Sequence, residues 1–138
     1  MELAAIELYK STQNNRYLQQ AIEYGRREPV TPWMGADSAR HYQWYPFMNM
    51  GHYWLAKTEN NTRLNEEFIR NIRIGLQRTY EKARQNPFLY GIPAIWCSNN
   101  LTTAMLTQCR LYREVTGDST YEEMEASLRD WLFGCNPW

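Results

Sequence analysis

Apolar residues recur every three or four positions along most of the chain, which is the period of an α-helix that faces a core. The clearest stripe covers residues 64–83, where charged side chains occupy the opposite face. Further stripes cover residues 3–9, 17–22, 101–112 and 124–132. The nearest approach to a strand, residues 89–96, contains Gly91 and Pro93, which weaken a strand. We therefore expect an all-α fold.

A helix–turn–helix pattern repeats along the chain. Residues 8–17 resemble residues 111–121, and residues 55–64 form a looser third copy. Such repeats predict antiparallel helical hairpins that stack to share a core. The expected hairpins cover about 2–28, 44–85 and 98–134, and their tight turns fall near Gln13, Asn60 and Gly117.

The segments between hairpins differ from the tight turns. They are long, aromatic and rich in proline, which is typical of loops that carry function. A helix expected over 44–58 is apolar nearly all round, so it should be buried, whereas the stripe over 64–83 predicts an outer helix. The chain starts within a helical pattern and ends on Asn136-Pro137-Trp138, which we interpret as a segment of a larger protein.

Charge excludes some classes of partner. The 138 residues carry 15 Lys+Arg and 15 Asp+Glu, so the formal net charge is zero. This removes the electrostatic argument for binding nucleic acid or an anionic membrane. No run of about 18 apolar residues exists that would span a bilayer. We expect no nucleic-acid partner and no membrane association.

Cysteine use favours a reduced protein. The chain has three cysteines, Cys97, Cys109 and Cys135, in no metal-binding CxxC pair. We expect all three to be packed thiols, and we expect no metal or other cofactor. A disulfide between Cys97 and Cys109 is the alternative, and its geometry is not visible in the sequence.

Several motifs together resemble glycoside hydrolase family 9. They are HYQWYPFMNMGHYWLA at 41–56, IWCSNN at 95–100, Thr116-Gly117-Asp118 followed by Tyr121, and WLFGCNPW at 131–138. Their order and spacing carry the resemblance more than any single motif does. The resemblance covers nearly the whole chain.

The resemblance implies an (α/α)6 barrel of six hairpins, of which three hairpins are about half. It also implies inverting hydrolysis of β-linked glycans, such as cellulose-like β-1,4-glucans. In that reaction one carboxylate activates water and a carboxylic acid protonates the leaving oxygen. Family habit further implies a secreted or periplasmic location.

The catalytic carboxylates of the family are absent from this chain. Its Asp-Ala-Gly-Asp motif lies upstream of the matching region, and its catalytic glutamate lies downstream of the Asn-Pro turn. Gly35-Ala36-Asp37 only echoes the first motif, and Asp118 fits a turn and helix cap. We assign no catalytic residue and expect no hydrolysis by the isolated chain.

Substrate-binding residues remain. The family stacks sugar rings on aromatic side chains of the loops between hairpins, and Trp96 matches its tryptophan position, although Cys97 stands where glycine is frequent. Trp44 is the second candidate, and His41, Tyr45 and Asn99 can bond hydroxyl groups. Each tryptophan has core packing as its alternative, and Trp33 is a weaker stacking candidate. His52, on an apolar helix, is expected to be a hydrogen-bonded core histidine.

Two other classes of protein stay open at this point. One is another six-hairpin glycosidase or a polysaccharide lyase, and the other is a non-enzymatic helical repeat scaffold, against which the irregular spacing argues. The expected partners are a β-glycan and the remainder of the parent chain. Self-association is also expected, because the outer hairpins carry apolar residues that can form exposed edges. These are Leu3, Ile6, Leu8, Tyr9, Met124, Leu128, Trp131 and Leu132.

Overall fold

The computed structural model describes residues 1–40, 48–59 and 61–135. Within these ranges it contains six α-helices, one short π-helical turn and no strand. The α-helices are α1 (Glu2–Thr12), α2 (Asn15–Arg27), α3 (Met50–Ala56), α4 (Thr62–Ala83), α5 (Ser98–Thr116) and α6 (Glu122–Asp130). The π-helical turn η2 (Trp131–Cys135) follows α6 directly. The expected all-α class is confirmed.

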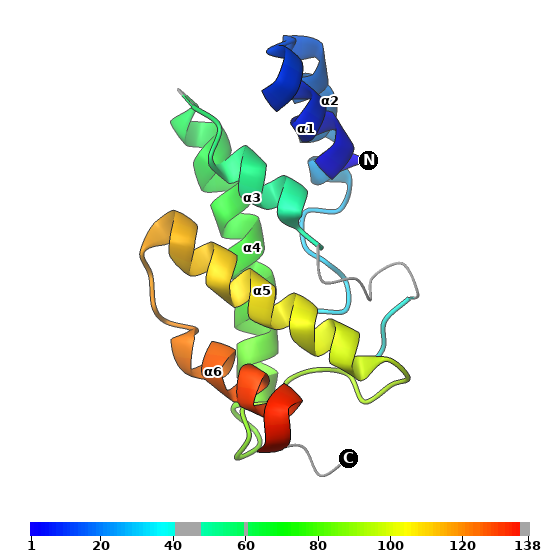
Figure 1. Cartoon of the computed structure of the whole chain (residues 1–138), viewed down its shortest axis with the longest axis vertical. Coiled ribbons are helices and arrows are strands. Elements are labelled where there is room, and N and C mark those ends of the chain that lie inside the picture. The colour runs from blue at the N-terminus through cyan, green and yellow to red at the C-terminus, as the bar shows by residue number, and fades with distance from the viewer. Residues whose placement is uncertain (41–47, 60, 136–138) are drawn as a thin grey trace.

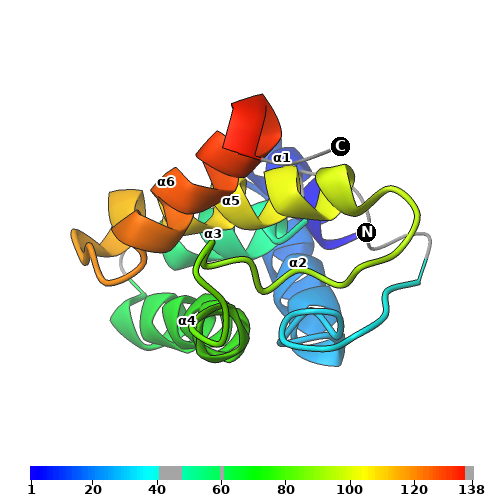
Figure 2. The same cartoon turned by 90° about the horizontal axis from the view of Figure 1, so that it is seen from below.

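Consecutive helices pack in pairs, so α1 lies against α2, α3 against α4, and α5 against α6. Figure 1 shows that α3 and α5 begin on the same side of the molecule, and the described parts of the two long connections between hairpins reach that side. Figure 2 shows α3 in the middle of the molecule, between α4 and α5. Three hairpins in this arrangement form about half of an (α/α)6 barrel.

Tight turns end the first helix of two hairpins. Gln13 and Gly117 both adopt the left-handed conformation, with φ of 56° and 72°. Their backbone N–H groups donate to Tyr9 O at 2.7 Å and Arg113 O at 2.8 Å, which satisfies carbonyls at the helix ends. The third expected turn, near Asn60, is centred outside the described residues, and Asn61 beside it caps α4 by accepting from the backbone N–H of Leu64.

The helix expected over 44–58 is shorter than the pattern predicts. In the structure α3 begins at Met50, because Asn49 has a φ of 61° and interrupts the helical backbone there. It ends at Ala56. Trp44 and the other residues of 41–47 lie outside the described part of the chain. An all-round apolar pattern therefore predicted burial correctly but overestimated helix length.

The apolar residues form two cores. The first lies between α1, α2, α3 and the beginning of α4, and consists of Ala5, Ile6, Leu18, Ala21, Ile22, Leu55, Ala56, Leu64 and Phe68. The second lies between the end of α4, α5, α6 and the connections, and consists of Trp33, Met34, Ile72, Leu76, Ala83, Ile92, Leu101, Ala104, Met105, Cys109, Tyr112, Tyr121, Met124 and Leu128. The long helix α4 contributes to both.

Three of the eight residues named as exposed edges are used inside these cores. Ile6 belongs to the first core, and Met124 and Leu128 belong to the second. Leu8 is 46% exposed on α1, and Phe133 is 86% exposed in η2. Each outer hairpin thus buries part of its apolar stripe against its own neighbours. Self-association stays a prediction.

Cys97 and Cys109 are both free thiols. Cys109 lies inside α5 and Cys97 directly precedes that helix, so twelve residues of helical rise, roughly 18 Å, separate them. A disulfide needs Cα atoms within about 7 Å, so these two cannot pair. Burial raises the pKa of the Cys109 thiol far above its ordinary value, which makes it unreactive. Of the described helices, none is both long enough and apolar enough to cross a bilayer.

Candidate glycan-binding site

Trp96 and Asn99 lie together at the start of α5, on the side of the molecule where the long connections end. Trp96 is the last residue but one before the helix, and 75% of its surface is exposed. Asn99 is in the first turn and is also exposed. The structure therefore brings two of the five predicted binding residues to one exposed place.

The backbone between Trp96 and α5 has a glycine-like conformation. Cys97 has a φ of 62°, in the left-handed region that glycine adopts without steric cost. The N–H of Ser98 donates to Ile95 O at 3.1 Å, which closes the turn that presents Trp96. By resemblance, glycine is frequent at this position of the family. The cysteine of this chain keeps the turn in place, at a conformational strain of roughly 1–2 kcal/mol.

His41, Trp44 and Tyr45 lie outside the described residues, so their roles stay predictions. Trp33, the weaker stacking candidate, is fully buried in the second core, with no exposed surface. It cannot stack on a sugar from that position. A tryptophan in a loop can anchor the loop to a core as readily as it can face solvent.

The two aspartates that echo catalytic positions have structural partners. Asp37 forms an ion pair with Lys82 of α4. Asp118 accepts hydrogen bonds from Thr120 N and from the Tyr112 hydroxyl, both at 2.9 Å. Bonding to the Thr120 hydroxyl is the main cause of the lowered pKa of Asp118. Asp118 therefore serves the turn as expected, but Tyr121 occupies the N-cap position of α6, without a side-chain capping bond, so the expected helix cap is wrong.

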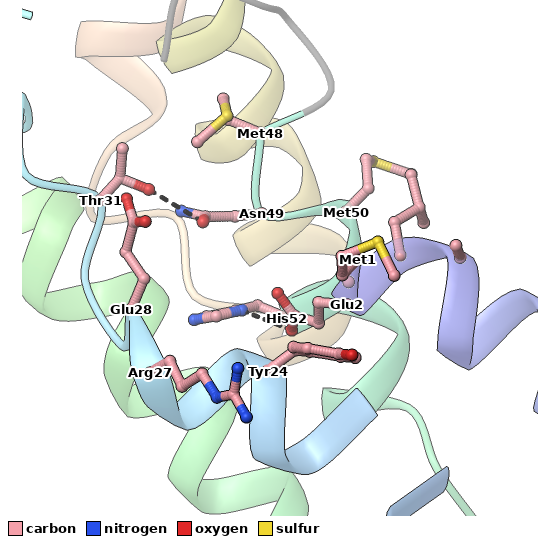
Figure 3. A pocket seen from close by; sticks show the side chains of 13 residues that line it. Met1, Glu2, Tyr24, Arg27, Glu28, Thr31, Met48, Asn49, Met50 and His52 are labelled. Atoms are coloured by element: carbon pink, nitrogen blue, oxygen red, sulfur yellow. Dashed lines mark hydrogen bonds and ion pairs between the residues drawn. The ribbon is translucent and has the colours of Figure 1, made fainter. Parts of the chain in front are cut away.

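A pocket of about 690 Å³ opens between the start of α1, the end of α2 and the start of α3 (Figure 3). Its volume falls in the range of small-molecule sites. Apolar lining comes from Met1, Met48 and Met50 and from the ring of Tyr24. Its polar side chains are Glu2, Arg27, Glu28, Thr31, Asn49 and His52. The sequence did not indicate this pocket, because its wall is assembled from three separate helices.

His52 is the buried histidine that the pattern predicts, with 1% of its surface exposed. Its Nδ1 lies 2.7 Å from Glu2 Oε1, and its Nε2 lies 3.1 Å from Pro29 O. Its ring packs edge-on against Phe68, with centroids 4.9 Å apart. Glu2 and Pro29 thus hold the ring of His52 through both of its nitrogens. His52 thus fixes α1 and the end of α2 to α3.

A second polar connection fixes the opposite wall of the pocket. The Thr31 hydroxyl donates to Asn49 Oδ1 at 2.9 Å, and Asn49 Nδ2 donates to Gln108 Oε1 at 2.7 Å. Thr31 and Gln108 are each 1% exposed. These bonds join the first connection, the start of α3 and the middle of α5, so the pocket wall is preorganised.

Glu28 differs from the other polar lining residues. It is the C-cap of α2, and its Oε1 atom is buried without a hydrogen-bond partner among the described residues. The only signal in the sequence was a carboxylate directly after a predicted helix, where the helix dipole is unfavourable to negative charge. Sequence reasoning missed this residue.

The comparison with protein families agrees with this architecture. The model of Glycosyl hydrolase family 9 matches residues 1–138, so the chain belongs to that family. This result excludes the repeat-scaffold and lyase alternatives and makes carbohydrate the expected substrate class. No curated protein and no solved structure matches the chain significantly.

Proposed function

We propose that this chain forms part of the barrel and of the substrate cleft of an enzyme that hydrolyses β-linked glycans with inversion. The observation that carries the proposal is the exposure of Trp96 at the start of α5. By resemblance, this residue matches a tryptophan of the family. A flat indole face matches the C–H face of a sugar ring. Asn99, one turn away, supplies an amide for the hydroxyl groups.

The chemistry itself requires two carboxyl groups that this chain does not supply. An inverting site places a general base and a general acid roughly 6.5–9.5 Å apart, with room for the attacking water. Among the described acidic residues near the connections, Asp37 is paired with Lys82 and Glu2 with His52, and Oε1 of Glu28 is buried. The proposed role of this chain is therefore to position the glycan, and the carboxyl groups come from other parts of the parent enzyme, which acts outside the cytoplasm by family habit.

Binding of cellotetraose tests the proposal. Isothermal titration of the purified chain should detect it, and the α-linked isomer maltotetraose should bind more weakly. Trp96→Ala should reduce cellotetraose affinity roughly tenfold, because a stacked ring face is lost. Trp96→Phe, which keeps a smaller ring, should bind cellotetraose with an affinity between those of the native chain and Trp96→Ala.

The isolated chain should not hydrolyse aryl β-glycosides or soluble β-glucan. Turnover that disappears in Asp37→Asn would contradict both the placement of the carboxyl groups and the structural role of Asp37. Equal binding by the native chain and by Trp96→Ala would remove Trp96 from the site.

A further inference from the structure

The second connection between hairpins, residues 84–97, runs from the end of α4 beside α5 to the start of that helix, where it presents Trp96 (Figure 1). Near its middle, the hydroxyl of Tyr90 lies 3.1 Å from Thr102 Oγ1. Thr102 is fully buried in α5, and its own hydroxyl donates to Ser98 O at 2.9 Å. Ser98 is the first residue of α5, so these bonds link Tyr90 to the turn that carries Trp96.

The direction of the bonds follows from the protons that each group has. A threonine hydroxyl has a single proton, and Thr102 donates it to Ser98 O. Tyr90 is therefore the donor in its bond with Thr102. The result is a chain of hydrogen bonds that runs from the phenol of Tyr90 through Thr102 to the carbonyl group of Ser98. Hydrogen bonds in series polarise one another, which strengthens each of them.

Tyr90 is itself held firmly on the other side. Its ring stacks on the indole of Trp131, with centroids 4.2 Å apart and an angle of 26° between the planes. Phe88 packs edge-on against the same indole at 5.7 Å. Asn86 Nδ2 donates to Tyr90 O at 2.8 Å, and Asn86 Oδ1 accepts from Tyr90 N at 3.2 Å. The phenol therefore has a fixed place from which to hold the start of α5.

The turn that carries Trp96 lies beyond the anchored part of the connection. A Cβ atom on Gly91 would lie 2.3 Å from Thr79 O, so the backbone there packs directly on α4. Ile92, the next residue, is buried in the second core. Residues 94–97, in contrast, are partly or fully exposed. The bonds of Tyr90 and Thr102 reach the far end of this exposed turn, where α5 begins.

We infer that Tyr90 is a positioning residue for the glycan site: its hydroxyl fixes the first turn of α5 and thereby the orientation in which Trp96 meets a sugar ring. The inference rests on the proposed function, because Tyr90 acts through Trp96. An indole must present its face to the sugar in order to stack. Loss of order at the turn lowers the fraction of molecules that are ready to bind, and the apparent affinity falls with that fraction.

Tyr90→Phe tests the inference, because it keeps the ring that stacks on Trp131 and removes only the hydroxyl. Tyr112→Phe is the matched control, since the Tyr112 hydroxyl donates to Asp118 Oδ2 at 2.9 Å near the other end of α5. In isothermal titration, Tyr90→Phe should bind cellotetraose roughly threefold more weakly than the native chain. Tyr112→Phe should bind normally, although it loses a bond to a charged group and therefore more stability.

The indole N–H of Trp96 gives a second readout, which needs no ligand. Its heteronuclear NOE measures motion on the picosecond to nanosecond timescale, and the spectrum of Trp96→Phe identifies the signal. The NOE should fall in Tyr90→Phe and in Thr102→Val. It should stay native in Tyr112→Phe and in Thr102→Ser, which keeps the hydroxyl. Combining Tyr90→Phe with Thr102→Val should weaken binding no further than either change alone, because both residues act through one bond.

The possible failures can be told apart. Native affinity in Tyr90→Phe, together with loss of binding in Trp96→Ala, would overturn the inference and leave the proposed function standing. Equal losses in Tyr90→Phe and Tyr112→Phe would mean that general weakening of α5 is the cause, and the inference would be wrong. An unchanged Trp96 NOE in Tyr90→Phe would also contradict it. If the native chain does not bind cellotetraose, the proposed function fails and this inference fails with it.

Discussion

The two hydrophobic cores are built differently, although α4 passes through both. The first core is mainly aliphatic, and at its open end the bonded pair of His52 and Glu2 borders the pocket. The second core is richer in aromatic residues and takes Trp33 and Met34 from the first connection and Ile92 from the second. The connections are therefore anchored in the second core. Aromatic residues in these loops secure the rim of the barrel as well as furnishing its candidate site.

The cores also differ in the kind of side chain that faces a helix glycine. A Cβ atom on Gly25 of α2 would lie 2.6 Å from Phe68 Cε1, against a ring held by the packing of the first core. A Cβ atom on Gly75 of α4 would lie 2.5 Å from Met34 Sδ in the second core. A methionine side chain can move aside, whereas a packed ring cannot do so without opening the core.

The largest expected effect follows from this contrast. Gly25→Ala should lower the free energy of unfolding by about 1–3 kcal/mol, because overpacking forces the Phe68 ring or the helix to shift. Gly75→Ala should change it by less than about 1 kcal/mol, because the gain in helix propensity offsets the movement of Met34. Urea unfolding followed by circular dichroism measures both.

The opposite result for Gly25→Ala and Gly75→Ala would also be informative. Equal destabilisation by the two substitutions would mean that Met34 is held as firmly as Phe68, and the proposed difference between the cores would be wrong. Met34→Ala combined with Gly75→Ala would then separate loss of the side chain from lack of room for the new methyl group.

Sequence patterns captured the helices and hairpins because those features are local. The stripe over 64–83 matches α4, and the left-handed turn residues Gln13 and Gly117 were visible as breaks in helical periodicity. The site was only partly predictable. Trp96 is exposed as expected, but Trp33 is buried, and a loop tryptophan looks the same in either case. Glu28 was missed because a buried oxygen without a donor is a property of three-dimensional packing.

The second core should be sensitive to alkali. Tyr121 is 3% exposed, and its hydroxyl donates to Gln77 Oε1 at 2.9 Å. Burial raises the pKa of Tyr121 from 10.0 to about 12. The neutral phenol is therefore favoured in the folded protein, so its contribution to stability is complete below pH 10 and is lost as the pH rises through 12. The loss should reach about 2 kcal/mol near pH 12.

Tyr121→Phe provides the comparison, because it cannot ionise. At pH 8 the variant should be less stable than the native chain, because it lacks the hydrogen bond to Gln77. Its stability should decline less steeply between pH 10 and 12. Unfolding free energies at several pH values measure the two slopes. Parallel curves would show that Tyr121 is accessible to solvent and that the second core is not sealed around it.

The smallest expected effect concerns the outer side of the first core, where a single ion pair joins α2 to α4. Arg26 Nε and Nη2 donate to the two carboxylate oxygens of Glu67, each at 2.7 Å. Bonding to Arg26 lowers the pKa of Glu67 below its ordinary value of 4.5. The pair therefore stabilises the fold above that value and ceases to do so as the pH falls through the lowered pKa.

Because Arg26 is 57% exposed, the contribution should be below about 1 kcal/mol. Glu67→Gln should be less stable than the native chain at pH 7 by that amount, and the gap should close in acid, below the lowered pKa of Glu67. A gap that persists in acid would show that Glu67 acts through packing against α2 and that its charge is irrelevant to the junction.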